Sequence, residues 1–465
     1  MLKLIEEINS AVNNFIWGVP AMVCIIGVGL YLSIRTGFIQ IRKFKYAMKT
    51  TIGRIFKKRD ASDGSITPFQ AVCTALAATV GTGNIAGVAG AIAIGGPGAV
   101  FWMWISAILG MCTKFSEVTL AVHFRETNEK GELVGGPMYY IKNGLKKHWH
   151  WLAYLFSAFG VLTVFGTGNA TQVNTITTAI DSALINYNVI AADNTSTVNL
   201  VMGIILAILV AMILLGGIKR IGQVTEKLVP FMALFYIILA VGVIIINWKN
   251  VPGVFSAIIR GAFNPASVTG GVVGSFFMSM KKGVSRGIFS NEAGLGTGSI
   301  AHACADTRKP VKQGFFGIFE VFTDTIVICT LTALVILCVA GSGTASEFGA
   351  ENGASLTSLC FFTALGSPGG YAVAVCVVLF AFSTIIAWYY MGRQAAEYLG
   401  GKISGKIPAV YAVGYLLAAF LGCLGAMETV WEVSDIFNGL MAVPNLAALV
   451  LLAGEIYAPG EKRDP

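Results

Sequence analysis

Charged residues are scarce in this sequence. Asp, Glu, Lys and Arg make up only 12% of its 465 residues, whereas 55% are hydrophobic. Soluble domains carry about twice this fraction of charge, so the composition excludes a soluble globular protein and predicts a polytopic membrane protein. The net charge of +8 does not indicate nucleic-acid binding, because the basic residues gather in particular loops between long apolar runs.

The motifs of several functional classes are missing. The nine cysteines are scattered and form no C-x-x-C pair, so neither a disulfide framework nor a metal site of that kind is indicated. No complete nucleotide-binding loop, G-x-x-x-x-G-K-[ST], occurs, which argues against ATP-driven transport. No nucleophile–base pair stands out either. We therefore expect neither an enzyme nor an organic cofactor.

The long apolar runs predict an all-α protein with eleven transmembrane helices. Loops rich in Lys and Arg alternate with loops that have few. The positive-inside rule then places the N-terminus outside and the C-terminus in the cytoplasm of a multi-pass protein of the cell membrane. The basic segment 42–59 predicts an amphipathic helix on anionic lipid. The expected spans cover about residues 15–36, 67–94, 99–125, 151–180, 200–217, 229–247, 268–299, 314–340, 369–399, 407–426 and 435–457.

Two of the expected spans contain a break. The breaks are residues 79–84 (TVGTGN) in span two and residues 274–280 (GSFFMSM) in span seven. Glycine is costly inside a helix, and a break within lipid leaves backbone groups that water cannot satisfy. Two breaks in corresponding halves indicate a transporter binding site. The alternative for either stretch is close helix packing through small residues.

The breaks also predict the domain organisation. Residues 1–66 would hold the first span and the basic helix, residues 67–247 the spans two to six, and residues 268–457 the spans seven to eleven. Spans two and seven would cross the membrane in opposite directions, as in inverted five-helix repeats. The halves have no clear sequence identity, so this prediction depends on topology alone.

The first break offers groups for a carboxylate and for a cation. The second half-helix begins with free N–H groups and a partial positive charge, whereas the first half ends in free carbonyls that suit sodium. Gly81 and Gly83 allow a solute to approach the backbone closely. Thr79 and Thr82 add hydroxyl groups, and Asn84 can hydrogen-bond the unwound chain.

Three other spans supply candidate pocket residues. In span seven, Phe277, Met278 and Met280 would make the pocket small, unless they are only core packing. Span four presents an aromatic and two amides at helical spacing, which would either line a polar pocket or join helices. These residues are Phe165, Asn169 and Gln172.

Span nine carries two adjacent hydroxyl groups deep in an apolar run. Ser383 and Thr384 follow Phe380, and together with backbone carbonyls they would form an all-oxygen site of the kind that a hard cation prefers. The alternative is that both hydroxyls bond to the preceding turn of their own helix. Trp388 on the same span is included among the candidate substrate-binding residues.

Carboxylates within the spans give a rival mechanism. Glu320 and Asp324 lie four residues apart on one face of span eight. Such groups indicate either a proton relay or a structural ion pair, here with Lys281, Lys282 or Arg286. A proton-coupled amino acid symporter is therefore the alternative, and a sensor or channel that does not pump is the second one.

Two further ionisable sites are interpreted as structural. Lys114 and Glu117 are three residues apart on span three and can pair. His302 lies near the end of a span, and we expect it to be packed there rather than to carry protons.

Three motifs resemble those of the alanine or glycine:cation symporter family, in the same order over essentially the whole chain. They are residues 78–87 (ATVGTGNIAG), 135–140 (GGPMYY) and 287–297 (GIFSNEAGLGT). The resemblance implies the leucine-transporter-like fold of the amino acid–polyamine–organocation group. It also implies sodium-coupled uptake of alanine and glycine, with sodium as the transported co-substrate. We expect the protein to work as a monomer.

The same resemblance implies particular site residues. Residues 80–84 look like the unwound first core helix of leucine-transporter-like proteins, V-G-x-G-N, so the substrate carboxylate would meet the amides near Gly81 and Gly83. Phe277 would act as a lid. In some relatives an Asn just before this stretch serves another sodium site, and Ala78 replaces it here, so we expect one sodium ion. Its ligands would be the carbonyls of Ala77, Val80 and Phe380 and the hydroxyls of Ser383 and Thr384.

Overall fold

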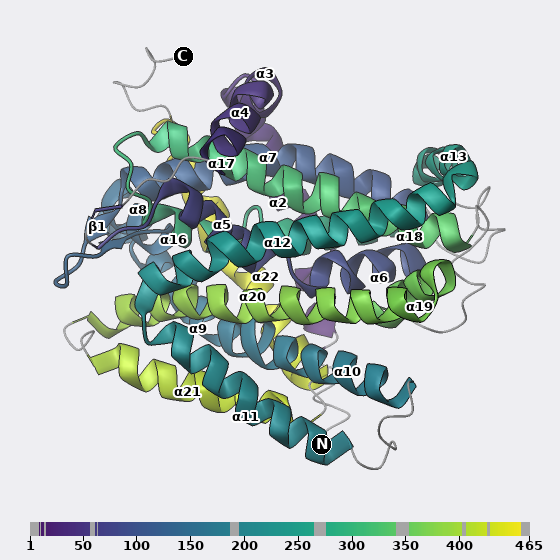
Figure 1. Ribbon diagram of the computed structural model, residues 1–465. Helices are drawn as coiled ribbons and strands as arrows, with labels where there is room; N and C mark the ends of the chain where they lie inside the picture. The colour runs from purple at the N-terminus through teal and green to yellow at the C-terminus, as the bar shows by residue number, and fades with distance from the viewer. Residues whose placement is uncertain are drawn as a thin grey trace.

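The computed structural model is a bundle of long helices, most of which are seen lengthwise in Figure 1. It describes residues 9, 11–13, 15–55, 61–62, 64–186, 195–264, 276–340, 353–401, 406–425 and 428–456. Within this part, seven helices are long and apolar enough to cross a membrane, or eight if the bent pair α5–α6 is one span. The prediction of an all-α, multi-pass membrane protein is confirmed, whereas the number of eleven spans stays a prediction.

The first half of the chain contains the first broken span. Helix α5 begins at Pro68, directly after Thr67, whose hydroxyl accepts from the amide of Gln70 and so caps the helix, and α6 continues after a bend of 59°. The elements are α2 (Val19–Arg35), α3 (Ile39–Arg42), α4 (Phe44–Ile55), α5 (Pro68–Thr79), η1 (Thr82–Asn84), α6 (Ala86–Gly95), α7 (Gly98–His123), β1 (Glu126–Thr127), β2 (Leu133–Val134), α8 (Pro137–Gly144), η2 (Lys147–Trp149), α9 (Trp151–Phe165), the π-helix η3 (Gly166–Ala170), α10 (Thr171–Asn186), α11 (Thr195–Leu214) and α12 (Gly217–Ile246).

The second half contains two helices, α15 and α16, that are separated by a short break, and another π-helix within a long span. Its elements are η5 (Trp248–Asn250), α13 (Val251–Phe263), α15 (Phe276–Asn291), α16 (Thr297–Ala303), α17 (Pro310–Val321), the π-helix η6 (Phe322–Cys329), α18 (Thr330–Ala340), α19 (Ala354–Leu365), α20 (Ser367–Gly400), α21 (Ile407–Gly422) and α22 (Glu428–Leu451).

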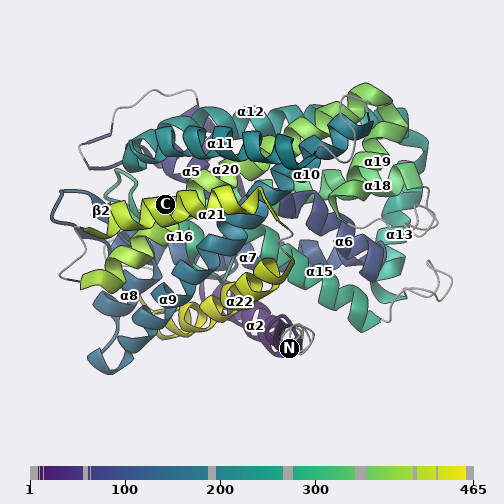
Figure 2. The ribbon, with the colours of Figure 1, turned by 90° about the horizontal axis from the view of Figure 1, so that it is seen from below.

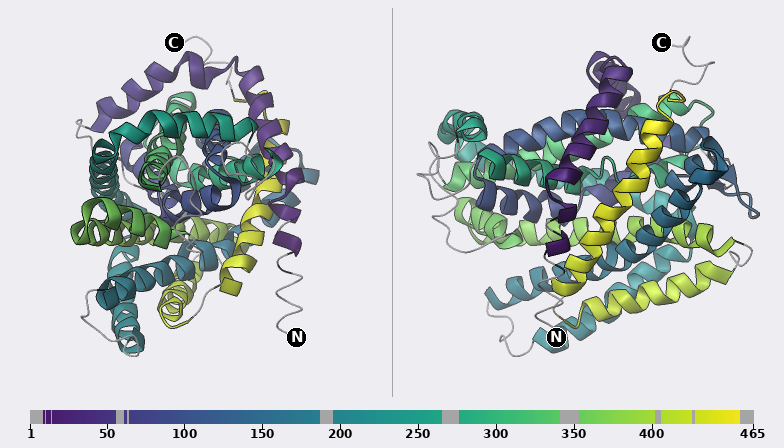
Figure 3. Two further views of the ribbon diagram at one scale, coloured as in Figure 1. Left: turned by 90° about the vertical axis from the view of Figure 1, so that its right-hand side faces the viewer. Right: turned by 180° about the vertical axis from the view of Figure 1, so that it is seen from behind.

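The helices differ strongly in how deeply they are buried. The apolar stretch of α7 is 83% buried within the protein, because α15 and α17 pack along this helix. The apolar stretch of α11 is only 22% buried. Helix α11 lies at the edge of the bundle beside α21 (Figure 2). Helices α2 and α22 pack together along another side (Figure 3). The exposed apolar faces suit lipid, whereas α5 packs against α12, α16 and α20 inside the bundle.

The two ends of the bundle carry different structures. The hairpin of β1 and β2, which pairs Glu126 with Val134, lies at one end together with α8 and α16 (Figure 1). Helices α13 and α19 lie at the other end. Arg125 donates to the carbonyls of Ala303, Ala305 and Thr307, so it fixes the segment after α16 against the hairpin end.

The break predicted at residues 274–280 is wrong over its described part. Residues 274 and 275 lie outside the described residues, but 276–280 form the regular start of α15. Span seven is instead interrupted between Asn291 and Thr297. There Gly294 and Gly296 have φ angles of 100° and 83°, a region that glycine adopts without steric cost. The large residues of the predicted break do not favour a positive φ angle, so they do not interrupt a helix in this way.

Candidate substrate and cation site

The first break is stabilised by one of its own side chains. Helix α5 ends at Thr79, because Val80 leaves the helical conformation and Gly81 after it is extended. The amide of Gly81 then donates to Asn84 Oδ1 at 2.9 Å, which replaces the lost helical hydrogen bond. The predicted role of Asn84 in holding the unwound chain is confirmed. This bond also occupies the Gly81 amide, so the N–H groups left to meet a carboxylate are those of Thr82 and Gly83, which are half-buried.

Oxygen atoms from α5 and α20 cluster next to this break. Ser383 Oγ lies 2.8 Å from the carbonyl oxygen of Phe380 and 3.3 Å from that of Ala77. Thr384 Oγ1 lies 3.0 Å from the same Phe380 oxygen. The structure therefore brings together four of the five predicted sodium ligands. The fifth predicted ligand, Val80, lies directly after α5 and is buried. The contacts described for these residues do not join its carbonyl oxygen to the other four ligands.

Gly81 allows these two segments to approach each other. A Cβ atom at position 81 would lie 2.8 Å from Thr384 Oγ1, which is closer than van der Waals contact permits. Both hydroxyls also bond to their own helix, as the alternative interpretation predicted. The contact of Ser383 with Ala77 is the exception, because it crosses to the broken helix.

Three of the predicted substrate-binding residues lie around the same break: Thr82, Gln172 and Trp388. Thr82 Oγ1 donates to Gln172 Oε1 at 3.2 Å, and Gln172 in turn donates to the carbonyl of Thr167 in η3. Trp388 Nε1 lies 3.4 Å from the carbonyl oxygen of Ala78. Thr79 is different, because its hydroxyl is nearest to carbonyls of its own helix.

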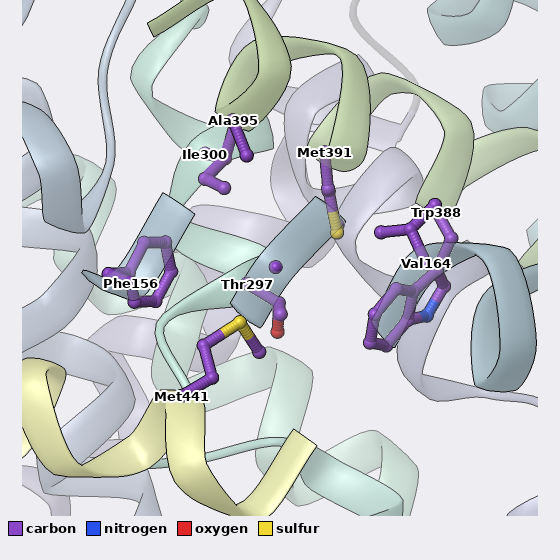
Figure 4. A pocket seen from close by; sticks show the side chains of 9 residues that line it. Phe156, Val164, Thr297, Ile300, Trp388, Met391, Ala395 and Met441 are labelled. Atoms are coloured by element: carbon purple, nitrogen blue, oxygen red, sulfur yellow. The ribbon is translucent and has the colours of Figure 1, made fainter. Parts of the chain in front are cut away.

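A small cavity of about 10 Å³ lies beside Trp388, toward α16 (Figure 4). It is lined almost entirely by apolar side chains from four helices, with Thr297 as the polar exception. The lining residues are Phe156, Gly160, Val164, Thr297, Ile300, Trp388, Met391, Ala395 and Met441.

Four predicted pocket residues do not lie at this centre. Phe165 packs against Tyr411 and Tyr415 of α21, with ring centroids 5.3 and 6.2 Å apart. Phe277 is 68% exposed, and Met278 is exposed as well. Met280 is one turn further along α15 and is half-buried. Because α15 is continuous, these positions are separated from its C-terminal end at the break by several turns.

The aromatic side chain of α15 that does reach the first break is Phe289. Its ring lies 3.5 Å from where a Cβ atom of Gly83 would be. It also contacts Trp17 edge-on at 6.3 Å and lies under the Arg286 guanidinium at 5.6 Å. Sequence reasoning missed Phe289 because it placed the break too early, although the recognised stretch 287–297 contains it.

The second break is closed by buried polar side chains. Glu117 Oε1 accepts from the amide of Gly294 at 2.9 Å and from Asn445 Nδ2 at 2.7 Å. Asn445 also donates to the Gly294 carbonyl at 2.8 Å and hydrogen-bonds Tyr140. Glu292 accepts from the hydroxyl of Thr297. The N–H and the carbonyl of Gly294 are therefore already satisfied by protein side chains.

The predicted ion pairs are replaced by a different one. Lys114 pairs with Glu320 at 3.2 Å rather than with Glu117, and both side chains are fully buried. His302 Nε2 lies 3.1 Å from the other oxygen of Glu320, so this histidine is packed as predicted but also part of a charged network. Glu320 is thus held by two groups that lie far away in the sequence.

Comparisons with known proteins find relatives that match nearly the whole chain. The family model described as the sodium:alanine symporter family matches residues 2–461. An uncharacterized transporter of Haemophilus influenzae is 44% identical over 96% of this chain and 93% of its own length. The sodium/alanine symporter AgcS of Methanococcus maripaludis is 41% identical, over 98% and 96%. The probable sodium/glutamine symporter GlnT of Bacillus subtilis is 38% identical, over 98% and 90%.

The fold has a solved counterpart. The crystal structure of MhsT in complex with L-phenylalanine superposes with a TM-score of 0.60, covering 87% of this chain and 92% of that chain at 14% identity. This likeness confirms the leucine-transporter-like fold. Together with the full-length family match, it shows that the chain belongs to the sodium:alanine symporter family of membrane transporters.

Proposed function

We propose that this protein is a sodium-coupled symporter that moves alanine and glycine across the cell membrane by alternating access. The observation that carries the proposal is the oxygen cluster between α5 and α20, directly against Gly81. Carbonyl and hydroxyl oxygens are suitable ligands for a hard cation. A sodium ion bound there would hold the break of α5 against α20, so sodium binding would prepare the substrate site.

The substrate carboxylate would bind to the amides of Thr82 and Gly83. These amides lie at the start of the second half-helix, where the helix dipole favours a negative charge. The Thr82–Gln172 hydrogen bond and the ring of Phe289 lie next to them. These groups restrict the space for a substrate side chain, which favours alanine and glycine over a long side chain such as that of glutamine.

The transport cycle would be a rocking motion of two repeats around this site. Residues 67–247 and 268–457 would form the inverted repeats, with the N-terminus outside and the C-terminus in the cytoplasm. The cavity beside Trp388 is lined by residues of α16, which lies at the same end of the bundle as α8 and the β1–β2 hairpin (Figure 1), the end expected to face the cytoplasm. We expect one protomer to suffice, because both breaks and all site residues come from one chain, with lipid covering the apolar faces.

The rival mechanisms have different consequences. Proton coupling through Glu320 and Asp324 would let a proton gradient drive uptake without sodium, and the binding of the Glu320 carboxylate by Lys114 and His302 argues against Glu320 as the carrier. A sensor or channel would bind alanine but would not accumulate it. Transport measurements distinguish both of these mechanisms from sodium-coupled symport.

A binding experiment tests the proposed site first. Radiolabelled alanine is titrated onto the purified protein in sodium and then in potassium at equal ionic strength, and glycine or glutamine is added as a competitor. We expect saturable alanine binding in sodium only, with competition by glycine and not by glutamine. Equal binding in potassium would contradict the sodium site, and strong competition by glutamine would contradict the small pocket.

A further inference from the structure

Three side chains of α15 form a row that leads to the first break. Lys282, Arg286 and Phe289 are three or four residues apart, so they share one face of this helix. That face packs against α6 and the segment η1 before it (Figure 2). Each side chain lies 3.2 to 4.0 Å from where a glycine Cβ would be: Lys282 at Gly95, Arg286 at Gly87 and Phe289 at Gly83. The row therefore runs from the expected outer end of α15 to the amides of the first break.

The guanidinium of Arg286 has no counter-ion in this row. It lies 5.6 Å from the ring centroid of Phe289 and 6.0 Å from that of Trp431 on α22, so two aromatic rings hold it by cation–π attraction. With the described residues it forms neither an ion pair nor a hydrogen bond. The ion pair that the sequence predicted with Glu320 is made by Lys114 instead. A half-buried guanidinium without an acceptor can receive a carboxylate.

A carboxylate with an unused oxygen lies near this guanidinium. Asp435 is one helical turn after Trp431 on α22, and the charge of Arg286 acts on it. Asn13 donates to Asp435 Oδ2 at 3.3 Å, and Trp17 donates to the backbone carbonyl of Asp435 at 3.1 Å. Asp435 Oδ1 is buried and has no hydrogen-bond partner. Because a buried acceptor without a partner is costly, this oxygen is suited to receive a donor from a ligand.

We propose that Arg286 and Asp435 form an outer binding site for the amino acid zwitterion, which the substrate occupies before it reaches the first break. The substrate carboxylate would bind the guanidinium of Arg286, and the substrate ammonium would donate to Asp435 Oδ1. The proposal rests on the symport function proposed above and names the residues that first receive the substrate.

The ring of Phe289 separates the outer site from the central one. Arg286 lies over this ring, and Gly83 of the first break lies next to it. Trp17 contacts the ring edge-on at 6.3 Å. A shift of Phe289 would thus connect the two sites, and the carboxylate would pass from Arg286 to the amides of Thr82 and Gly83.

The charges around the site favour a zwitterion over a simple anion or cation. Helix α15 has no acidic residue, and Lys282 lies one turn outward from Arg286, so the approach along α15 attracts carboxylates. Asp435 supplies the negative charge that the ammonium group needs. Glu432, the preceding acid on α22, already accepts a hydrogen bond from the N-terminal segment. Two charged contacts bind weakly, with a Kd on the order of 1 mM, so the outer site stays empty when micromolar alanine fills the central one.

The first test measures protection of Arg286 from chemical modification and does not depend on transport. The purified full-length protein in lipid is treated with phenylglyoxal, which reacts with guanidinium groups, and mass spectrometry quantifies the labelling of each arginine. The buffer contains potassium, so that sodium does not prepare the central site. Alanine at about ten times the expected Kd should slow the labelling of Arg286 at least about fivefold.

Two controls belong to this measurement. Alaninamide, which lacks the carboxylate, should not protect Arg286. Arg260, which is exposed on α13, should be labelled at the same rate under all conditions. Absence of protection in potassium, or equal protection by alaninamide, would overturn the proposal. Protection in sodium alone would overturn it as well, because it would show closure over the central site and no binding at Arg286.

The second test measures how fast alanine reaches and leaves the central site in sodium, by stopped-flow tryptophan fluorescence. A site on the route speeds both steps equally, so Arg286→Gln should lower the association and dissociation rates about tenfold each and keep the Kd within about twofold. This unchanged Kd also shows that the variant is folded. Arg286→Lys keeps the charge and should recover part of the rate. Lys281→Gln removes a cation that points about 100° away from the row, and it should behave like wild type.

The kinetic result separates a site on the route from a structural role. Unchanged rates in Arg286→Gln, or a loss of affinity without slower association, would overturn the proposal. Equal slowing in Lys281→Gln would also overturn it, since the general positive charge of α15 would then be responsible. If the wild type bound no alanine in sodium, the proposed symport function would fail, while protection in potassium would still decide the outer site.

Discussion

The two breaks solve the same physical problem in opposite ways. In the first break, Asn84 takes the amide of Gly81, and the neighbouring groups are neutral hydroxyls and carbonyls. In the second break, the carboxylate of Glu117 and the amide of Asn445 satisfy both the N–H and the carbonyl of Gly294. A break that is sealed by the protein's own side chains has little left to offer a solute. We therefore assign solute binding to the first break and a structural role to the second. The helix that leads into the second break places Phe289 beside the binding site.

The largest effect is expected from closing the gap at Gly81. In Gly81→Ala, the new methyl group would overlap Thr384 Oγ1 and push α20 away from the break. We expect sodium-driven alanine uptake to fall by at least about 100-fold, as small displacements at a site can do. Gly90→Ala is the matched control, since no atom lies within 4 Å of its Cβ position, and its uptake should stay within about twofold of wild type. Equal uptake by both variants would contradict the close approach of the two segments.

Removal of both hydroxyls from α20 tests the cation side of the first break. In the double variant Ser383→Ala/Thr384→Ala, two of the proposed ligands are lost, and the sodium concentration for half-maximal uptake should rise about 30-fold. Thr363→Ala removes a hydroxyl that likewise bonds to its own helix but lies on α19, and it should leave the sodium dependence unchanged. If the double variant also behaves like wild type, these hydroxyls are helix caps and not sodium ligands.

The comparison of Phe289 with Phe277 tests where the second break meets the pocket. Phe289 lies against Gly83, whereas Phe277 is several turns away and largely exposed. Phe289→Ala should weaken alanine binding about tenfold, and Phe277→Ala should not change it. Binding titrations on both variants measure this directly. The reverse result would restore the lid position expected from the sequence.

The smallest effect is expected from the polar groups that η3 and α10 place next to the first break. Gln172→Ala removes the acceptor of the Thr82 hydroxyl, which should weaken alanine binding about fivefold, the value of one ordinary hydrogen bond. Asn174→Ala is a matched amide that faces the loop after α21 instead, and its affinity should be that of wild type. Unaltered affinity in Gln172→Ala would show that these polar groups do not line the substrate pocket.

The first break was predictable because local signals agree there. Gly81, Gly83 and Asn84 lie within four residues, and apolar runs flank them on both sides. Composition and hydrophobic runs likewise predicted the membrane helices, and the hydroxyls of Ser383 and Thr384 were identified because they are rare inside an apolar run.

The second break was missed because its signals are not local. Gly294 and Gly296 lie in a motif that was recognised as characteristic of a family, but their positive φ angles are not evident from the residue types alone. The groups that close this break, Glu117 and Asn445, come from spans more than a hundred residues away. The pairing of Lys114 with Glu320 was missed for the same reason, since a nearer partner, Glu117, was available in the sequence.

The most direct test of the central claim is alanine uptake into proteoliposomes under an inward sodium gradient, an inward proton gradient or neither. The account predicts that alanine accumulates above its outside concentration only when the sodium gradient is present, and that a proton gradient alone does not drive it. Accumulation with protons alone would contradict the sodium site between α5 and α20. Alanine binding without accumulation under any gradient would show that the protein is a sensor or a channel.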